Sequence, residues 1–372
     1  MLTKLNNALM GAWMVAAVTM VALGGVARAT GQSPQLKPRA AGTAPAAVDK
    51  RMHIDVEVTD KGGAPVGGLK AGDFKLLVDK KPVEATGFSA VEETVVESSD
   101  QGGAVRTSSE PVEVILVLDE VNIGFTQVSY VRQQVEKYLR MNGGRLAAPT
   151  RLVVFSSAGI RMQNQATLDG NGMADFVSKL DPGLRVMKSS SGAEGANEMF
   201  ELSLKNFSII AENQLHNNGR KLLLWLGPGW PLVHNERTVY NESDHAHNYS
   251  AIQMLLNLMR EARITVYDVR NYADDMAVND YYEAFLKPVK QVQDSDPADL
   301  ALGVLAVESG GRVTDPSNDL AAELAKCVND ASAYYTMRFE PVGIGKPGRY
   351  HSIEVKVTRP GVKVRSVTGY YE

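Results

Sequence analysis

Oxygen-bearing side chains lie toward the end of an apolar run of this 372-residue chain. Asp119 comes near the end of the run PVEVILVLDEVNIGF, and Glu120 and Asn122 follow it closely. In a strand, successive side chains point to opposite faces, and this run is apolar on both. The pattern predicts a strand buried inside an α/β sheet. Acids at the carboxyl end of such strands lie where open α/β sheets bind ligands, and their oxygens suit hard cations such as Mg²⁺. These three residues are the first candidate binding site.

A second candidate site consists of histidines in NESDHAHNYS. On an extended segment His245 and His247 would share a face and, with Asp244 or Glu242, could hold Zn²⁺ or Cu²⁺. The segment lacks a regular ligand pattern such as HExxH. We therefore favour an exposed polar loop between a strand and the next helix, which would also contain His234.

Other reactive patterns are incomplete. GPGWPL resembles the beginning of a dinucleotide fingerprint, but Leu232 replaces the third glycine, so we interpret it as a strand-ending turn. The chain contains no GxSxG elbow and no P-loop. Cys327 is the only cysteine, which excludes an intramolecular disulfide, and its helical pattern predicts a small buried residue. Nucleophilic catalysis would therefore require a spatial arrangement that the sequence does not disclose.

The amino terminus predicts export. Lys4, the uncharged run Ala8–Val26 and the small residues around Arg28 are typical of a signal peptide over residues 1–29. We expect a periplasmic or secreted protein. Because the apolar run approaches the ~20 residues that span a bilayer, an uncleaved membrane anchor stays open as an alternative. Residues 30–50 are rich in Pro, Ala, Gly and Ser and predict a flexible linker. The net charge of -4 argues against a nucleic-acid partner.

Strands and helices alternate in the middle of the chain, and strands alone occur at its ends. We expect β-strands over 51–97, a linker over 98–110, an α/β domain over 111–332 and β-strands over 333–372. The α/β domain should be a doubly wound, mostly parallel sheet. Since an isolated hairpin is marginal, the two terminal strand groups should pair into one small β-sandwich. Within the α/β domain we expect strands at 112–119, 151–156, 221–228 and 264–270, and helices at 126–141, 196–215, 250–263, 298–311 and 318–333, the last with Asn318 as N-cap.

Several stretches together resemble bacterial proteins with a von Willebrand factor type A related domain, which are abundant in Acidobacteria. They are HIDVEVTDKGGAPVGGLKAGDFKLLVDKKP, PVEVILVLDEVN, KLLLWLGPGWP, DASAYYTMRFEP and RPGVKVRSVTGYY, and the resemblance covers nearly all of the chain after Arg51. It implies an envelope-associated or secreted, non-catalytic protein whose α/β domain binds other macromolecules.

The resemblance also implies the position of a metal site. Type A domains often hold a divalent ion through Asp-x-Ser-x-Ser after the first strand, together with a Thr-Asp-Gly segment. Asp119 matches the first position, but Val121 and Ile123 replace the serines, and Gly227 and Pro228 stand where the other oxygens would be. We therefore expect a degenerate metal site with no cofactor, which leaves Asp119, His245 and His247 as weak candidate ligands.

The first hypothesis is a non-enzymatic interaction protein that binds a protein or cell-envelope partner at the strand ends. A membrane partner follows only if the anchor is retained. The alternative is a metal-dependent binder or hydrolase that uses Asp119 with Glu120, or the His245/His247 pair. A third hypothesis is a structural component of an envelope assembly. The binding face predicted under the first hypothesis comprises Asp119, Glu120, Asn122, the turn from Gly227 to Trp230, and Asp268; Trp230 is the residue type most often a hot spot if it is exposed.

Two further segments allow two interpretations each. Acids and aromatics between Asn271 and Asp296 could form a protein-binding surface or a helical insertion whose aromatics pack inward. Cationic residues on the carboxyl-terminal strands could attract an anionic surface, although charges at outward positions commonly keep a sheet edge soluble. They are Arg338, Lys346, Arg349, Lys356, Arg359, Lys363 and Arg365.

Overall fold

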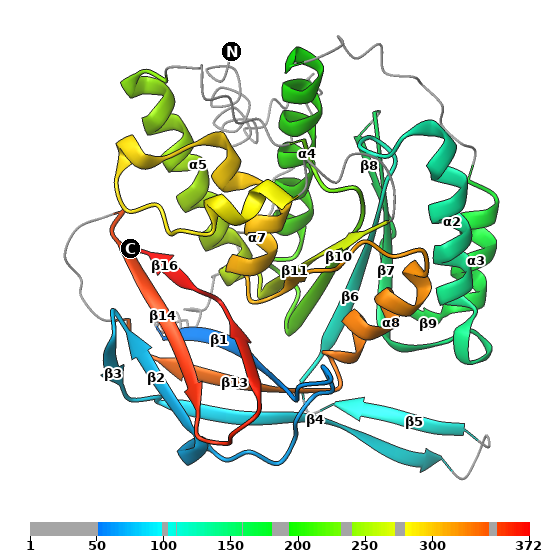
Figure 1. The fold of residues 1–372 in the computed structure, drawn as a ribbon. Coiled ribbons are helices and arrows are strands. Elements are labelled where there is room, and N and C mark those ends of the chain that lie inside the picture. Colours follow the sequence, from blue (N-terminus) through cyan, green and yellow to red (C-terminus); the bar gives the residue numbers. More distant parts are fainter. Residues whose placement is uncertain are drawn as a thin grey trace, which may run out of the picture. The chain divides into compact units, whose positions relative to one another are not determined.

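Seven strands form the central sheet of the computed structural model (Figure 1). Five of them run parallel in the order β12-β11-β10-β6-β7, and two short strands pair antiparallel with β7 at one edge. Their bounds are β6 Val112–Asp119, β7 Arg145–Ser156, β8 Gly159–Met162, β9 Thr167–Asp169, β10 Arg220–Gly227, β11 Ile264–Arg270 and β12 Arg312–Val313. The mostly parallel sheet expected from the sequence is confirmed.

The structure describes residues 51–98, 103–108, 110–157, 159–180, 193–231, 240–271, 280–341 and 348–372. Arg51–Glu372 forms one compact unit. The predicted signal peptide and flexible linker lie outside the described residues, as do His234 and Lys346. None of the helices within the described ranges is long and apolar enough to cross a membrane.

Helices cover both faces of the central sheet. On β6, Val114, Leu116 and Leu118 enter one hydrophobic cluster, whereas Ile115 and Val117 enter a second cluster on the opposite face. The first face is covered by α2 Phe125–Leu139, α3 Gly170–Ser178 and α8 Leu320–Asn329, and the second by α4 Ala193–Asn213, α5 Glu242–Glu261 and α7 Leu302–Glu308. This two-sided burial explains why β6 is apolar at almost every position.

The two ends of the chain pair with each other in two antiparallel sheets. β1 pairs with β13 between Met52↔Phe339 and Val56↔Tyr335, and β14 pairs with β2 between Ile353↔Val78 and Val357↔Phe74. One sheet contains β15 Lys363–Ser366, β1 Met52–Thr59, β13 Ala333–Phe339, β4 Gly87–Ser98 and β5 Gly103–Ser108; the other contains β16 Gly369–Tyr371, β14 Tyr350–Val357, β2 Phe74–Val78 and β3 Lys81–Val83. A third hydrophobic cluster takes residues from both sheets, including Ile54, Leu76 and Val355.

Some local predictions differ from the structure. The expected linker 98–110 contains β5, which forms a hairpin with β4, for example through Val96↔Val105. Helix α8 has Asp319 as its N-cap, because the Asp319 carboxylate accepts a hydrogen bond from the Ala322 amide, so Asn318 lies one position too early. None of α3, β8 and β9 was predicted from the sequence.

Short 3-10 helices complete the fold: η1 Ala71–Asp73, η2 Met141–Gly144, η3 Asp280–Phe285, η4 Val292–Asp294 and η5 Pro297–Leu300. Two of them, η3 and η4, lie between Asn271 and Asp296, which favours the helical interpretation of that segment where it is described. Tyr282 of η3 packs its ring against the Arg270 guanidinium at 5.0 Å. Tyr272, Asp274 and Asp275 lie outside the described residues.

Candidate functional site

Asp119, the residue that resembles the first ligand of a metal site, is fully buried and saturated with protein donors. Its Oδ1 accepts the backbone N–H groups of Val121 and Asn122, both at 2.9 Å. Its Oδ2 accepts the Asn122 side-chain amide and the Trp225 indole N–H, both at 2.7 Å. Four donors use the lone-pair directions that a carboxylate offers. We call this arrangement of Asp119, Asn122 and Trp225 the Asp119 latch.

The latch is positioned by the register of the central sheet. Asp119 and Trp225 project on the same face of neighbouring strands, because Val117 and Trp225 are paired and Asp119 lies two residues beyond Val117. Gly227 is the residue beside Asp119, and a Cβ atom there would lie in van der Waals contact with the Asp119 Cβ, at 3.4 Å.

Burial and hydrogen bonding act on the Asp119 carboxyl in opposite directions. Burial raises its pKa above the ordinary value, while hydrogen bonds from Asn122, Trp225 and Val121 favour the charged form. The geometry is that of a structural carboxylate that closes the loop between β6 and α2. A divalent ion at this position would have to displace N–H donors that cannot themselves coordinate a cation.

The two residues predicted beside Asp119 also have internal partners. Glu120 forms an ion pair with Arg132 of α2, whose Nη1 donates to the Leu180 carbonyl at 2.9 Å. The Asn122 side chain donates a second hydrogen bond to Ser203 Oγ of α4 at 2.9 Å. The Asn122 Oδ1 atom is buried without a partner among the described residues. These contacts attach the β6–α2 loop to the helices on either side of the sheet.

Trp230 was predicted to be a hot spot only on the condition that it is exposed, and it is buried. Its side chain is 5% exposed and packs edge-on against Trp225 and Phe207, at centroid distances of 5.1 and 5.8 Å. The turn from Gly227 to Trp230 thus places the Trp230 ring in the core, against the apolar face of α4. Exposure cannot be inferred from the residue type alone.

Asp268 is likewise an interior residue. It is fully buried, and Arg270 donates from Nε to its Oδ2 at 3.0 Å. Its Oδ1 has no hydrogen-bond partner within the described part of the chain. Burial raises the pKa of Asp268, and the neighbouring Arg270 opposes that effect. The structure thus places Asp268 inside the fold, where it pairs with a cation of its own strand.

The expected loop around the histidines is the first half of helix α5. Asn241 caps the helix by accepting the Asp244 amide, and Asp244 accepts the Asn241 amide in return. Two residues apart on a helix, His245 and His247 point in different directions, in contrast to the shared face of an extended segment. The His245 Nδ1 atom lies 2.9 Å from the Ser295 carbonyl oxygen. Within the described residues, no cluster of three or more His, Cys, Asp or Glu side chains has metal-binding geometry.

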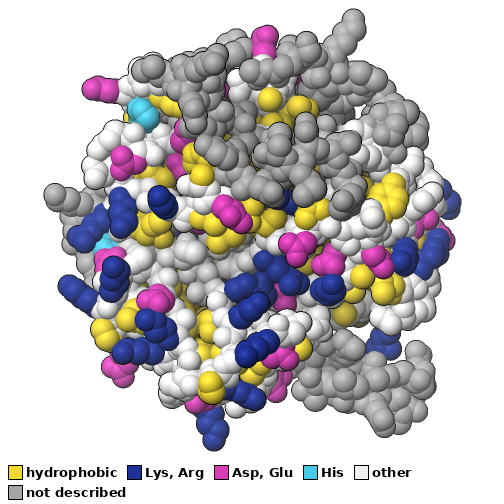
Figure 2. All heavy atoms as spheres, in the orientation of Figure 1, with side chains coloured by type: hydrophobic (Ala, Val, Ile, Leu, Met, Phe, Trp, Pro, Cys, Tyr) yellow, Lys and Arg dark blue, Asp and Glu magenta, His cyan; other side chains and the backbone are white. Residues whose placement is uncertain are grey.

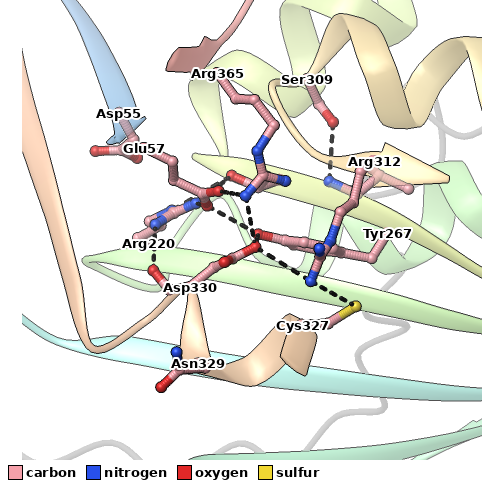
Figure 3. A network of polar contacts seen from close by, with 12 residues as sticks. Asp55, Glu57, Arg220, Tyr267, Ser309, Arg312, Cys327, Asn329, Asp330 and Arg365 are labelled. Atoms are coloured by element: carbon pink, nitrogen blue, oxygen red, sulfur yellow. Dashed lines mark hydrogen bonds and ion pairs between the residues drawn. The ribbon is translucent and has the colours of Figure 1, made fainter. Parts of the chain in front are cut away.

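A buried polar network, which the sequence did not reveal, lies at the opposite end of the central sheet (Figure 3). Glu57 of β1 pairs with Arg220 of β10 and with Arg365 of β15. Tyr267 of β11 donates a hydrogen bond to Glu57 at 2.8 Å and lies 3.0 Å from Asp330. The network therefore joins the amino-terminal half of the central sheet to the five-stranded antiparallel sheet.

Two further contacts extend this network. Arg365 donates to Asp330 at 2.8 Å, and the Arg312 guanidinium lies 3.6 Å from the Cys327 sulfur. Burial alone would lower the pKa of Arg220, but the Glu57 carboxylate raises it above its ordinary value. Because the charges are paired and hydrogen-bonded, their burial is tolerated and the two parts of the fold are held in one arrangement.

Comparisons with known proteins gave structural neighbours only. No protein-family model and no curated protein matches the chain. An aerotolerance-related membrane protein from Bacteroides fragilis is 11% identical, with 60% of this chain and 98% of that chain covered and a TM-score of 0.30. BatB from Bacteroides thetaiotaomicron is 12% identical over 59% and 98% of the chains, with a TM-score of 0.29. The pilus adhesin SpaC from Lactobacillus rhamnosus GG is 10% identical over 82% and 49%, with a TM-score of 0.32. At these scores the similarities carry no argument about function.

Proposed function

We propose that this chain is an exported, non-enzymatic interaction protein that binds a protein or cell-envelope partner at the carboxyl-terminal end of its central sheet. We infer that its α/β part is related to von Willebrand factor type A domains of the bacterial kind found in Acidobacteria, carried on a β-sandwich made by both chain ends. In this proposal the metal site is degenerate and the partner binds without a cation.

The observation that carries the proposal is the Asp119 latch. A carboxylate that accepts two backbone N–H groups, an amide and an indole N–H has no lone pair directed toward solvent. In a metal-dependent adhesion site the equivalent carboxylate would face an ion and, through it, a partner. Here the same carboxylate instead fixes the loop from Glu120 to Gly124, which supports a preformed binding surface.

Gly124 provides a direct test of this surface. It is exposed, has ordinary backbone angles, and a Cβ atom there would meet no atom within 4 Å. We call the surface at the carboxyl-terminal end of the central sheet, which includes Gly124, the strand-end face. Gly124→Arg therefore adds a bulky side chain to this face at little cost to folding. Gly72 in η1 is equally open, so Gly72→Arg is a matched control in the connection between β1 and β2 of the antiparallel sheets.

The experiment is crosslinking of the purified full chain to an envelope extract, followed by identification and reconstitution of the captured partner. We expect one saturable partner that Gly72→Arg retains and Gly124→Arg loses by at least about tenfold, which is the effect of one disrupted hot spot. Equal binding by both variants would refute the strand-end assignment.

Cation dependence separates the proposal from the metal-dependent alternative. A site-specific ion should raise the unfolding temperature by mass action. We expect no stabilisation by Mg²⁺, Ca²⁺, Mn²⁺ or Zn²⁺, and partner binding that is unchanged by a chelator. Saturable stabilisation by one of these ions, lost in Asp119→Asn, would contradict the proposal.

A further inference from the structure

Exposed charge is strongly segregated in this protein. In the described ranges 51–92, 333–341 and 348–372, exposed Lys and Arg residues outnumber exposed Asp and Glu residues, although the whole chain has a net charge of -4. The cationic set is Arg51, Lys61, Lys70, Lys75, Lys80, Lys81, Arg338, Arg349, Lys356, Arg359 and Lys363, and the anionic set is Asp60, Glu84, Glu92, Glu340 and Glu354. The described parts of the chain in these ranges thus present more exposed positive than negative charge, in a protein whose net charge is negative.

Four lysines form the part of this surface contributed by the four-stranded sheet, and we call them the lysine face: Lys75, Lys80, Lys81 and Lys356. Lys75 and Lys356 are directly opposite each other in the β2–β14 pair, and Lys80 and Lys81 are at the β2–β3 turn. Figure 2 shows Lys and Arg side chains gathered over the region where Figure 1 places these strands.

The lysine face is poorly neutralised by the protein itself. Like charges directly opposite on neighbouring strands are destabilising. Lys356 pairs with Glu354 at 3.1 Å, whereas Lys75, Lys80 and Lys81 have no ion pair with any described residue. The arrangement therefore costs stability in the free protein, and an external anion would offset that cost.

The position of the lysine face separates it from the strand-end face. Leu76, Val78, Ile353 and Val355 point inward to the third hydrophobic cluster, so Lys75 and Lys356 at the alternate positions point outward. The carboxyl ends of β6 and β10 lie at the opposite end of the folded unit (Figure 1). Occupation of one face thus leaves the other open.

We propose that the lysine face docks on an anionic lipid bilayer and turns the strand-end face away from it. Lysines are compact point charges that attract phospholipid headgroups without requiring a shaped pocket. Lys75 and Lys356 project from the outward face of the sheet, and Lys80 and Lys81 lie at the end of its β2–β3 hairpin. The chain enters the folded unit through β1 of the adjoining sheet, after the predicted export segment and linker. The inference rests on the proposed envelope location.

The test is cosedimentation of the full chain with vesicles of phosphatidylcholine alone or with added phosphatidylglycerol. Replacement of all four lysines of the lysine face by Gln is compared with replacement of four exposed lysines of the α/β part, Lys179, Lys205, Lys287 and Lys290. Both variants keep the same amino terminus, so any binding by the apolar run appears equally in both and on neutral vesicles.

We expect wild type and the control variant to prefer phosphatidylglycerol vesicles and to lose that preference at high salt. The partitioning of the lysine-face variant into phosphatidylglycerol vesicles should be roughly several hundred-fold weaker than that of wild type, at about fivefold for each lysine removed. Equal partitioning of the two variants, or no preference of wild type for anionic vesicles, would overturn the inference. Binding to heparin without binding to vesicles would also overturn it and would identify an anionic polysaccharide instead. Partner capture that depends on Gly124 tests the strand-end proposal separately.

Discussion

Glu308 offers the sharpest test of how buried charge acts in this fold. It is the last residue of α7 and lines a small cavity with Arg260, Tyr350 and Ile264, where the central sheet meets β14 and β16. Burial, with a smaller contribution from the neighbouring Asp299, raises the pKa of Glu308 to about 8. No described residue donates a hydrogen bond to its carboxyl group. The folded protein should therefore hold this side chain neutral at pH 7.

The pKa difference converts into a pH-dependent stability. An unfolded glutamate has an ordinary pKa near 4.5, so the folded state binds an additional proton between pH 4.5 and about 8. Stability from this group is fully present below pH 4.5 and is lost as the pH rises through about 8. The shift corresponds to at most about 5 kcal/mol at 1.36 kcal/mol per unit. Because the side chain keeps some contact with solvent, we expect about 2–4 kcal/mol.

The perturbation is Glu308→Gln, which keeps the shape and removes the ionisation. The free energy of unfolding should be measured by urea denaturation at pH values from 5 to 9 for wild type and variant. We expect similar stabilities at pH 5 and a variant that is about 2–4 kcal/mol more stable than wild type at pH 8 to 9. Glu283→Gln, at an exposed glutamate of η3, controls for the loss of one negative charge.

The difference in the free energy of unfolding between wild type and Glu308→Gln reports on Glu308 alone, because the other buried acids titrate in both proteins. A stability difference that stays constant within about 0.5 kcal/mol from pH 5 to pH 9 would refute the reasoning. That result would mean that water or a cation reaches the carboxyl group and stabilises its charge in the folded state.

Three other predictions follow from the buried groups. Asp119→Asn replaces a carboxylate oxygen by an NH2 group, which would face the N–H donors that now surround Asp119. We expect the free energy of unfolding, measured by urea denaturation, to fall by about 2–3 kcal/mol. An unchanged urea midpoint would contradict the role given to the Asp119 latch. Glu57→Gln removes the carboxylate that pairs with Arg220 and Arg365 and should lower the free energy of unfolding, measured in the same way, by about 3–5 kcal/mol. An unchanged free energy of unfolding would mean that the two arginines find other partners. Burial raises the pKa of the Cys327 thiol to about 12, so an aromatic disulfide reagent at pH 8 should label it only after unfolding, and rapid labelling of the native protein would exclude that burial.

The local pattern of apolar and polar residues predicted strands well where a strand buries both faces or only one. The doubly apolar run before Asp119 predicted β6 because a parallel central strand has no polar face. The alternation in β1 and β14 likewise predicted strands with one buried face. The histidine segment was misjudged because its polar residues cap and begin α5, a role that polarity alone does not distinguish from a loop.

The strand and helix alternation and the pairing of the two chain ends could be predicted from the sequence. Tertiary structure alone decided what the remaining polar groups do. Asp119 meets Trp225 106 residues away, and Glu57 meets Arg365 308 residues away. Contacts of this kind depend on sheet order and register, which local periodicity does not specify. For that reason a motif residue that resembles a metal ligand proved to be an internal structural carboxylate.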